Sequence, residues 1–110
     1  SETVKVFTLN GSKPDIYFWR SHDGLEVDLL IQCNGKLVPV EIKLTATPNI
    51  NHIKPLQKFK TLAGADAAET GILVCRVARE TPMPMNNIAM PWHKYPGWLM
   101  KVIQSPGAMT

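Results

Sequence analysis

The chain has 110 residues, 45% of them hydrophobic and 19% charged, which predicts a single globular domain and excludes a disordered chain. The net charge of +3 permits an anionic partner without requiring one. No stretch approaches the roughly 20 apolar residues of a membrane span and no signal peptide opens the chain, so we expect no membrane partner. Cys33 and Cys75 form no metal-binding motif and predict free, buried thiols in a reducing cytoplasm.

The first 44 residues include a predicted antiparallel meander of three strands, from Asp15 to Leu44. Residues 1–9 alternate weakly, which leaves a strand and the end of a helix as alternatives, and the run from Asn10 to Pro14 interrupts any regular element. Asp15 to Arg20 is aromatic and β-branched, which predicts a strand. Two more strands are expected on either side of Asn34-Gly35, a dipeptide typical of the type I′ hairpin turn.

This turn fixes the register of a hairpin that runs from Glu26 to Leu44. A two-residue loop pairs Cys33 with Lys36, so facing positions sum to 69. One face is then apolar along its whole length, with these pairs: Val27 and Ile42, Leu29 and Val40, Ile31 and Val38.

The other face of the hairpin carries charge. There Asp28 lies opposite Glu41, and Glu26 lies opposite Lys43. Two carboxylates about 5 Å apart repel each other by about 3 kcal/mol at an effective dielectric constant of about 20. We therefore expect a cation, a proton or a water network between Asp28 and Glu41.

Beyond the hairpin, a helix is expected from about Asn51 to Ala63. Asn51 is predicted as its N-cap, Pro55 falls in its first turn, and Gly64 suits the position just past its end. Residues at helical spacing form its apolar stripe: Ile53, Leu56, Phe59, Leu62 and Ala63.

The remainder of the chain predicts more strand and a last helix. Residues 70–77 are nearly all apolar, which predicts a buried strand that crosses back beside the meander. Residues 82–87 are expected to form a loop. Ile88 to Trp92 predicts a short edge strand, because Pro91 has no N–H for a ladder. Tyr95 to Gln104 predicts a helix that packs through Trp98, Leu99 and Val102.

The residues Asp28, Glu41 and Lys43 have the types and spacing of a metal site for phosphodiester hydrolysis. Mg²⁺ takes one or two carboxylates together with water and substrate phosphate, and two neighbouring strands supply such a pair. Strand alternation also places the backbone carbonyl of Ile42 near the pair. A lysine beside the metal can position or deprotonate a water and stabilise charge on a phosphate. The alternative is a surface ion-pair ladder in which Glu26 neutralises Lys43.

Other polar and aromatic residues give weaker signals. Lys54, Lys58 and Lys60 lie away from most of the helical stripe and are interpreted as a solvated face, with a phosphate-contacting face as the alternative. The three histidines share no metal-binding spacing and are expected to be surface or structural residues: His22, His52 and His93. The three tryptophans are expected in the core rather than as base-stacking platforms: Trp19, Trp92 and Trp98.

These motifs resemble the PD-(D/E)XK nuclease superfamily, whose core has the order αβββαβ. More narrowly, three segments are similar to the uncharacterised C-terminal domain of bacterial and archaeal AAA-type ATPases. The segments are Tyr17-Phe-Trp-Arg20, Asp23-Gly-Leu-Glu-Val-Asp-Leu-Leu30 and Gly35-Lys-Leu-Val-Pro-Val-Glu-Ile-Lys43. The similarity continues through the predicted helix to Met90-Pro-Trp92.

The resemblance implies an α/β fold with a restriction-endonuclease-like core, in one domain over residues 1–110 that ends a longer ATPase. The family's first core helix, expected just before Asn10, is then largely missing. Asp28 and Glu41 would ligate Mg²⁺ or Mn²⁺, and Lys43 would act on the attacking water. Glu26 matches a further acidic position of the family, and Gln57 falls where some relatives carry a polar site residue. The implied function is that of a metal-dependent DNA nuclease, and the alternative is a catalytically inactive DNA- or protein-binding module of the same fold.

Overall fold

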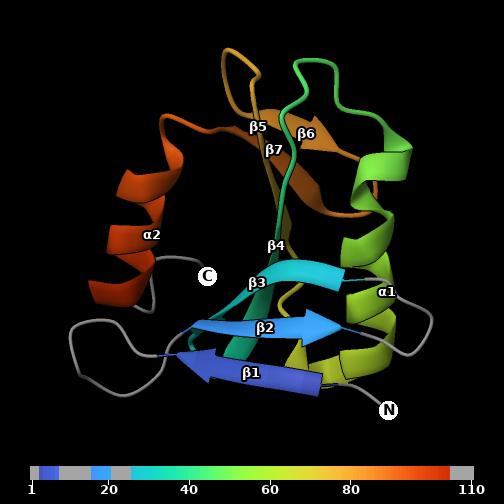
Figure 1. Cartoon of the computed structure of the whole chain (residues 1–110), viewed down its shortest axis with the longest axis vertical. Helices are drawn as coiled ribbons and strands as arrows, with labels where there is room; N and C mark the ends of the chain where they lie inside the picture. Colours follow the sequence, from blue (N-terminus) through green and yellow to red (C-terminus); the bar gives the residue numbers. More distant parts are fainter. Residues whose placement is uncertain (1–2, 8–15, 21–25, 105–110) are drawn as a thin grey trace.

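The structure is a computed structural model that describes residues 3–7, 16–20 and 26–104, with side chains for residues 27–101. In this part of the chain, strands form one mixed sheet in the order β1-β2-β3-β4-β5-β7-β6, and a helix packs on each face (Figure 1). The strands are β1 (Thr3–Phe7), β2 (Ile16–Arg20), β3 (Glu26–Cys33), β4 (Lys36–Ile42), β5 (Gly71–Cys75), β6 (Thr81–Met83) and β7 (Asn87–Pro91). The helices are α1 (Lys54–Ala63) and α2 (Tyr95–Gln104), and the predicted α/β fold class is confirmed.

The β3–β4 hairpin has the predicted turn and, next to it, the predicted register. Asn34 and Gly35 both have positive φ, +56° and +78°, as a type I′ turn requires. Facing residues sum to 69 from Cys33 and Lys36 as far as Leu29 and Val40.

The N-terminal residues form a strand rather than the end of a helix. β1 pairs antiparallel with β2 along its whole length, from Thr3 beside Arg20 to Phe7 beside Ile16. The antiparallel meander therefore has four strands, β1 to β4, instead of the three expected.

A β-bulge in β3 changes the register at the open end of the hairpin. Tyr17 faces Leu30, but Trp19 faces Val27, so two residues of β3, Asp28 and Leu29, lie opposite a single residue of β2. The extra residue offsets the alternation of side chains. Val27 consequently packs with Leu30 on the α1 face, and the predicted pairing of Val27 with Ile42 on a continuous apolar face is wrong.

Helix α1 covers the face of the sheet that carries Leu30 and Leu73. The predicted stripe is buried at Ile53, Leu56 and Phe59, but Leu62 is 51% exposed. Ile53, Leu56, Phe59 and Leu62 are each three residues apart, and three residues turn an α-helix about 60° less than a full turn. After three such spacings, Leu62 lies about 180° around the helix from Ile53. The inclusion of Leu62 in the core was therefore wrong.

The N-cap lies two residues earlier than predicted. A 3₁₀ turn, η1 (Ile50–Ile53), precedes α1, and the Asn49 side chain accepts the N–H of Asn51 at 2.9 Å. His52 Nδ1 in turn accepts the Asn49 N–H at 3.0 Å, which completes a reciprocal cap. His52 thus has the structural role expected of it, and Gly64 ends the helix with φ +57°.

Beyond α1, β5 is buried throughout and pairs in parallel with β4 on one side and β7 on the other. The strand predicted at the edge, β7, is internal, because part of the expected loop forms β6 beside it. Pro91 is tolerated there because the β6–β7 pairing ends at Thr81 and Ala89, before the proline is reached.

Helix α2 packs on the opposite face from α1, through Tyr95, Trp98 and Leu99. Val102, which was also expected to pack there, lies outside the described side chains. Cys33 and Cys75 are buried free thiols, as predicted. Neither α1 nor α2 has the length and apolar character needed to cross a bilayer, and this holds for every helix among the described residues.

Candidate functional site

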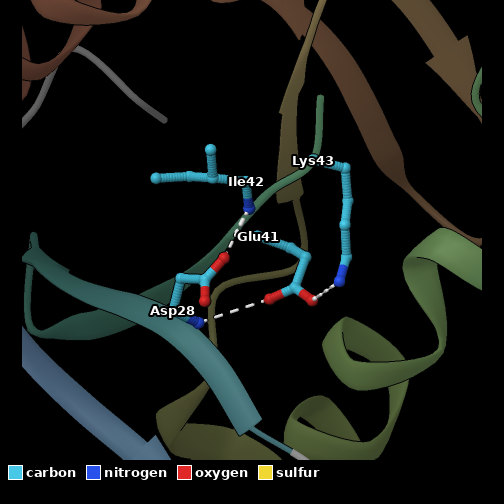
Figure 2. Close-up of polar contacts among 4 residues, drawn as sticks. All are labelled: Asp28, Glu41, Ile42 and Lys43. Atoms are coloured by element: carbon cyan, nitrogen blue, oxygen red, sulfur yellow. Dashed lines mark hydrogen bonds and ion pairs between the residues drawn. The ribbon is translucent and has the colours of Figure 1, made fainter. Parts of the chain in front are cut away.

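Asp28, Glu41 and Lys43 lie together at the open end of the β3–β4 hairpin (Figure 2). Lys43 Nζ is 3.4 Å from Glu41 Oε2, and the Asp28 N–H donates to Glu41 Oε1 at 3.3 Å. Figure 2 shows the side chains of Glu41 and Lys43 directed towards α1, while the Asp28 carboxylate is directed towards Ile42. The three residues singled out in the sequence therefore form one cluster.

The β-bulge sets the direction of the Asp28 carboxylate. In a regular ladder, the Ile42 N–H would meet a backbone carbonyl of β3. Regular β3–β4 pairing stops at Leu29 and Val40, and the Ile42 N–H instead donates to Asp28 Oδ2 at 2.7 Å. The hydrogen bond from the Ile42 backbone thus holds the Asp28 carboxylate beside the end of β4 and restricts its orientation.

Glu41 is the buried member of the cluster, with 3% of its surface exposed. Burial raises the pKa of Glu41 to about 7, and the negative charge of Asp28 adds to this increase. Lys43 and the Asp28 N–H act in the opposite direction, because both stabilise the ionised form. Near neutral pH, Glu41 therefore exchanges between its protonated and ionised forms.

Lys43 connects the buried carboxylate to solvent. Alternation along the strand puts Lys43 on the same face as Glu41, two residues away, and the lysine side chain is 45% exposed. Its backbone is fixed separately, because the Lys43 N–H donates to the Val74 carbonyl at 2.9 Å. The ammonium group can therefore reach both Glu41 and a molecule bound at the surface.

The donor set fits a hard divalent cation. A carboxylate has two oxygens with about four lone-pair sites, so a single hydrogen bond per oxygen leaves Asp28 and Glu41 able to accept more. A cation between them would also offset the repulsion that contributes to the raised pKa of Glu41. Among the described residues, no cluster of three or more His, Cys, Asp or Glu side chains is placed to hold a metal ion.

Two further predicted contributors remain predictions. Glu26 lies in β3, where its backbone pairs with Arg20 of β2, and its side chain is outside the described part. The β3–β4 pairing ends before Glu26 is reached, so the expected pairing of Glu26 with Lys43 is absent from the described ladder. For Ile42, the contact observed is made by its N–H, and a role for its carbonyl stays a prediction.

Gln57 is bonded to residues of the β6–β7 region, which β4 and β5 separate from Asp28 in the strand order of the sheet. Its Oε1 accepts from Asn87 Nδ2 at 2.8 Å, and its Nε2 lies 3.5 Å from the sulfur of Met85. Both partners belong to the β6–β7 region. The structure therefore shows Gln57 in a network that attaches α1 to β7, and shows no contact between Gln57 and the carboxylates.

The predicted basic face of α1 is divided between two roles. Lys60 Nζ donates to the carbonyls of Met85 and Asn86 and to Asn87 Oδ1, at 3.0, 3.2 and 2.9 Å. The ammonium group of Lys60 is therefore hydrogen-bonded to the turn between β6 and β7 and to the first residue of β7. Lys54 is exposed and Lys58 is half-buried, and phosphate contacts by either residue stay a prediction.

Sequence reasoning missed Asn87, the buried polar residue that links Gln57 and Lys60. It stands in a segment rich in Pro, Met and Asn that was interpreted as a loop. A polar residue at the start of an apolar run was the available signal, but its partners are about thirty residues away in the sequence.

Comparison with known proteins gives one match. A family model described as a domain of unknown function (DUF4143) matches residues 1–95. A search of curated proteins and a search of solved structures each return no match.

Proposed function

The chain belongs to the DUF4143 family, a domain of unknown function, and we propose, from the cluster of Asp28, Glu41 and Lys43, that it is a nuclease-like domain of the PD-(D/E)XK type. Its proposed activity is Mg²⁺-dependent hydrolysis of phosphodiester bonds in DNA. We propose further that it acts as the C-terminal part of an AAA-type ATPase in the cytoplasm, where its two buried thiols stay reduced.

The observation that carries this proposal is the arrangement of Asp28, Glu41 and Lys43. A buried carboxylate, a second carboxylate held by a backbone N–H and a half-exposed ammonium group converge at one end of a hairpin. Each group has a different part in hydrolysis. Asp28 and Glu41 would hold the cation, and Lys43 would orient the attacking water or the phosphate oxygen.

Bound Mg²⁺ would supply positive charge against the negative charge that builds up on the phosphate. The chain's own residues do the remaining work. Asp28 keeps its direction through the Ile42 N–H, so an oxygen ligand is in place before anything binds. Lys43 is anchored through its backbone to Val74 and keeps a mobile ammonium group at the surface, where it can donate to a phosphate oxygen.

A second candidate is a non-catalytic module of the same fold that binds DNA or protein. It is favoured by the Glu41–Lys43 ion pair, which together with the raised pKa of Glu41 lets the cluster exist without a cation.

Calorimetry with Mn²⁺ and cleavage assays on plasmid and single-stranded DNA would test the first candidate. Asp28→Asn and Lys43→Met are the test variants, and Asp66→Asn is the matched control because Asp66 is exposed and lies in the turn after α1. We expect Asp28→Asn to abolish Mn²⁺ binding and cleavage, and Lys43→Met to abolish cleavage with binding retained. Metal binding that is unchanged in Asp28→Asn would reject the proposed site.

The ATPase context requires a separate experiment. A pull-down between this chain and the ATPase portion of the same polypeptide tests assembly without reference to cleavage. Association without metal-dependent cutting by the full-length protein would favour the non-catalytic module. Cutting that depends on Lys43 would reject it.

A further inference from the structure

The face of the sheet opposite α1 has a cavity of about 460 Å³ between the end of β7 and α2. This volume lies within the range of ordinary small-ligand sites, roughly 300–1,000 Å³. Its wall is formed mainly by the segment 93–101, with one acidic residue from the loop before β6. The lining residues with functional side chains are His93, Lys94, Trp98, Lys101 and Glu80.

The balance of charge in this cavity favours an anion. Lys94 and Lys101 are both exposed, and Glu80 is the acidic residue among those that line the cavity. His93 adds a further hydrogen-bonding group. Phosphate is recognised in proteins by such groups of lysine and other donors near the surface.

An exposed tryptophan, Trp92, directly precedes the cavity-lining residue His93 in the sequence. Trp92 is 63% exposed, so the expectation that it lies in the core is wrong. Its backbone is rigid, because its N–H donates to the Cys75 carbonyl at 2.8 Å and its carbonyl accepts the Tyr95 N–H at 3.3 Å. An exposed indole on a hydrogen-bonded backbone, two residues before an exposed lysine, suits the binding of unpaired bases and their phosphates.

The topology connects this cavity to the carboxylate cluster. The carboxyl ends of the parallel strands β4, β5 and β7 lie at the same end of the sheet, at the top of Figure 1. Lys43, Arg76 and Trp92 follow their ends, and the Arg76 N–H donates to the Thr45 carbonyl at 2.8 Å. Lys43, Arg76 and Lys94 therefore come after neighbouring strand ends, where open sheets with parallel strands commonly bind ligands, with Lys43 directed towards α1 and the cavity on the α2 face.

We propose that the surface formed by this end of the sheet and the cavity binds single-stranded nucleic acid. Lys94 and Lys101 would contact its phosphates, and Trp92 would stack on a base. The inference deepens the proposed function and rests on it for the identity of the ligand. It names the form of the nucleic acid, since an indole can stack on an unpaired base but a base inside a duplex is already stacked on both faces.

Fluorescence anisotropy with a labelled single-stranded oligonucleotide, with EDTA present, tests the proposal without reference to cleavage. We expect the double variant Lys94→Ala/Lys101→Ala to weaken binding about tenfold or more. It should also lower the slope of log affinity against log salt by about 1.4, or about 0.7 for each lost phosphate contact. Trp92→Ala should weaken binding about tenfold, and Trp92→Phe should restore most of it.

Lys36→Ala is the control, because Lys36 is exposed at the start of β4, at the opposite end of that strand from Lys43. It should leave the affinity unchanged, and an equal loss in Lys36→Ala would overturn the proposal. A duplex bound as tightly as the single strand would overturn it as well. Competition by polyglutamate equal to that of the oligonucleotide would show a site for acidic protein and reject nucleic acid.

The two proposals can fail separately. With EDTA present, the unaltered chain should bind the oligonucleotide without cutting it, so binding is measured apart from cleavage. If DNA is cut but Lys94 and Lys101 prove irrelevant to binding, only the present inference is rejected. If the oligonucleotide binds as expected and no metal-dependent cutting occurs, the nuclease proposal fails and the binding surface remains.

Discussion

The backbone N–H of Asp28 donates to Glu41 Oε1, while the carboxylate of the same Asp28 raises the pKa of Glu41 by repulsion. Asp28→Asn keeps the backbone donor and removes the negative charge. We expect it to lower the pKa of Glu41 from about 7 towards 4.5, but only part of the way, because burial is the larger cause of the shift. NMR titration of the Glu41 side-chain carboxyl measures this, and an unchanged midpoint would mean that the two carboxylates do not interact.

Stability should fall as the pH rises through the range in which Glu41 ionises. The folded-state pKa of about 7 lies above the ordinary glutamate value of 4.5 expected in an unfolded chain, so the folded state binds the proton more tightly. The free energy of unfolding should therefore decrease between about pH 4.5 and pH 7, by about 3 kcal/mol from this group. Urea unfolding of Glu41→Gln should lack this component, and identical pH profiles for the two proteins would contradict the assignment.

Binding of Mn²⁺ should strengthen with rising pH up to about 7. A proton and the cation compete for the Glu41 carboxylate, whose pKa is raised to about 7. Below that value we expect affinity to fall by up to about tenfold per pH unit, with release of a proton on binding. Calorimetry in buffers of different ionisation enthalpy measures the released proton. Affinity that is independent of pH would show that Glu41 is not a ligand.

Asn87→Ala should destabilise the fold through the network between α1 and β7. Asn87 Nδ2 donates to the Gln57 side chain and to the Pro84 carbonyl, both at 2.8 Å, and its Oδ1 accepts from Lys60. Truncation removes the donor to Gln57 Oε1 and to the Pro84 carbonyl and one of the three acceptors of Lys60, at an expected cost of about 3 kcal/mol. Chemical denaturation measures the loss. Asn51→Ala, at an exposed position, is the control and should change stability by less than about 0.5 kcal/mol.

Gly71→Ala should destabilise the same region for a steric reason. A Cβ at Gly71 would collide with Asn87 Oδ1 and would also lie 3.3 Å from a methyl group of Leu56. We expect the cost of Gly71→Ala to shrink in the background of Asn87→Ala, because the smaller side chain removes the main collision. Gly97→Ala is the control, since nothing lies within 4 Å of its Cβ position. Equal costs in the two backgrounds would exclude the collision.

The parts of the fold that were predictable from sequence depend on local chemistry. Asn34 and Gly35 determine a turn, and the turn determines the register of the residues next to it. Strand alternation also predicted that Glu41 and Lys43 share a face, whereas the direction of the Asp28 carboxylate depends on the bulge, which was not predicted.

The errors occur where contacts between distant elements decide the outcome. Val27 is apolar and could be buried on either face of the sheet. The sequence around it therefore does not reveal the β-bulge, which directs its side chain towards α1. β6 exists because β7 offers it a partner, and three residues containing Pro82 have no strand signal of their own. The environment of Lys60 could not be predicted either, because all three of its acceptors lie beyond β5.

The two outer strands of the sheet differ in their capacity to accept another strand. β6 has three residues, and the nitrogen of Pro82 carries no hydrogen, so this edge offers few donors to an approaching chain. β1 has five residues and no proline in its sequence. Edge-to-edge association should therefore be suppressed beside β6, and any extension of the sheet by a strand from another segment or molecule is favoured at β1.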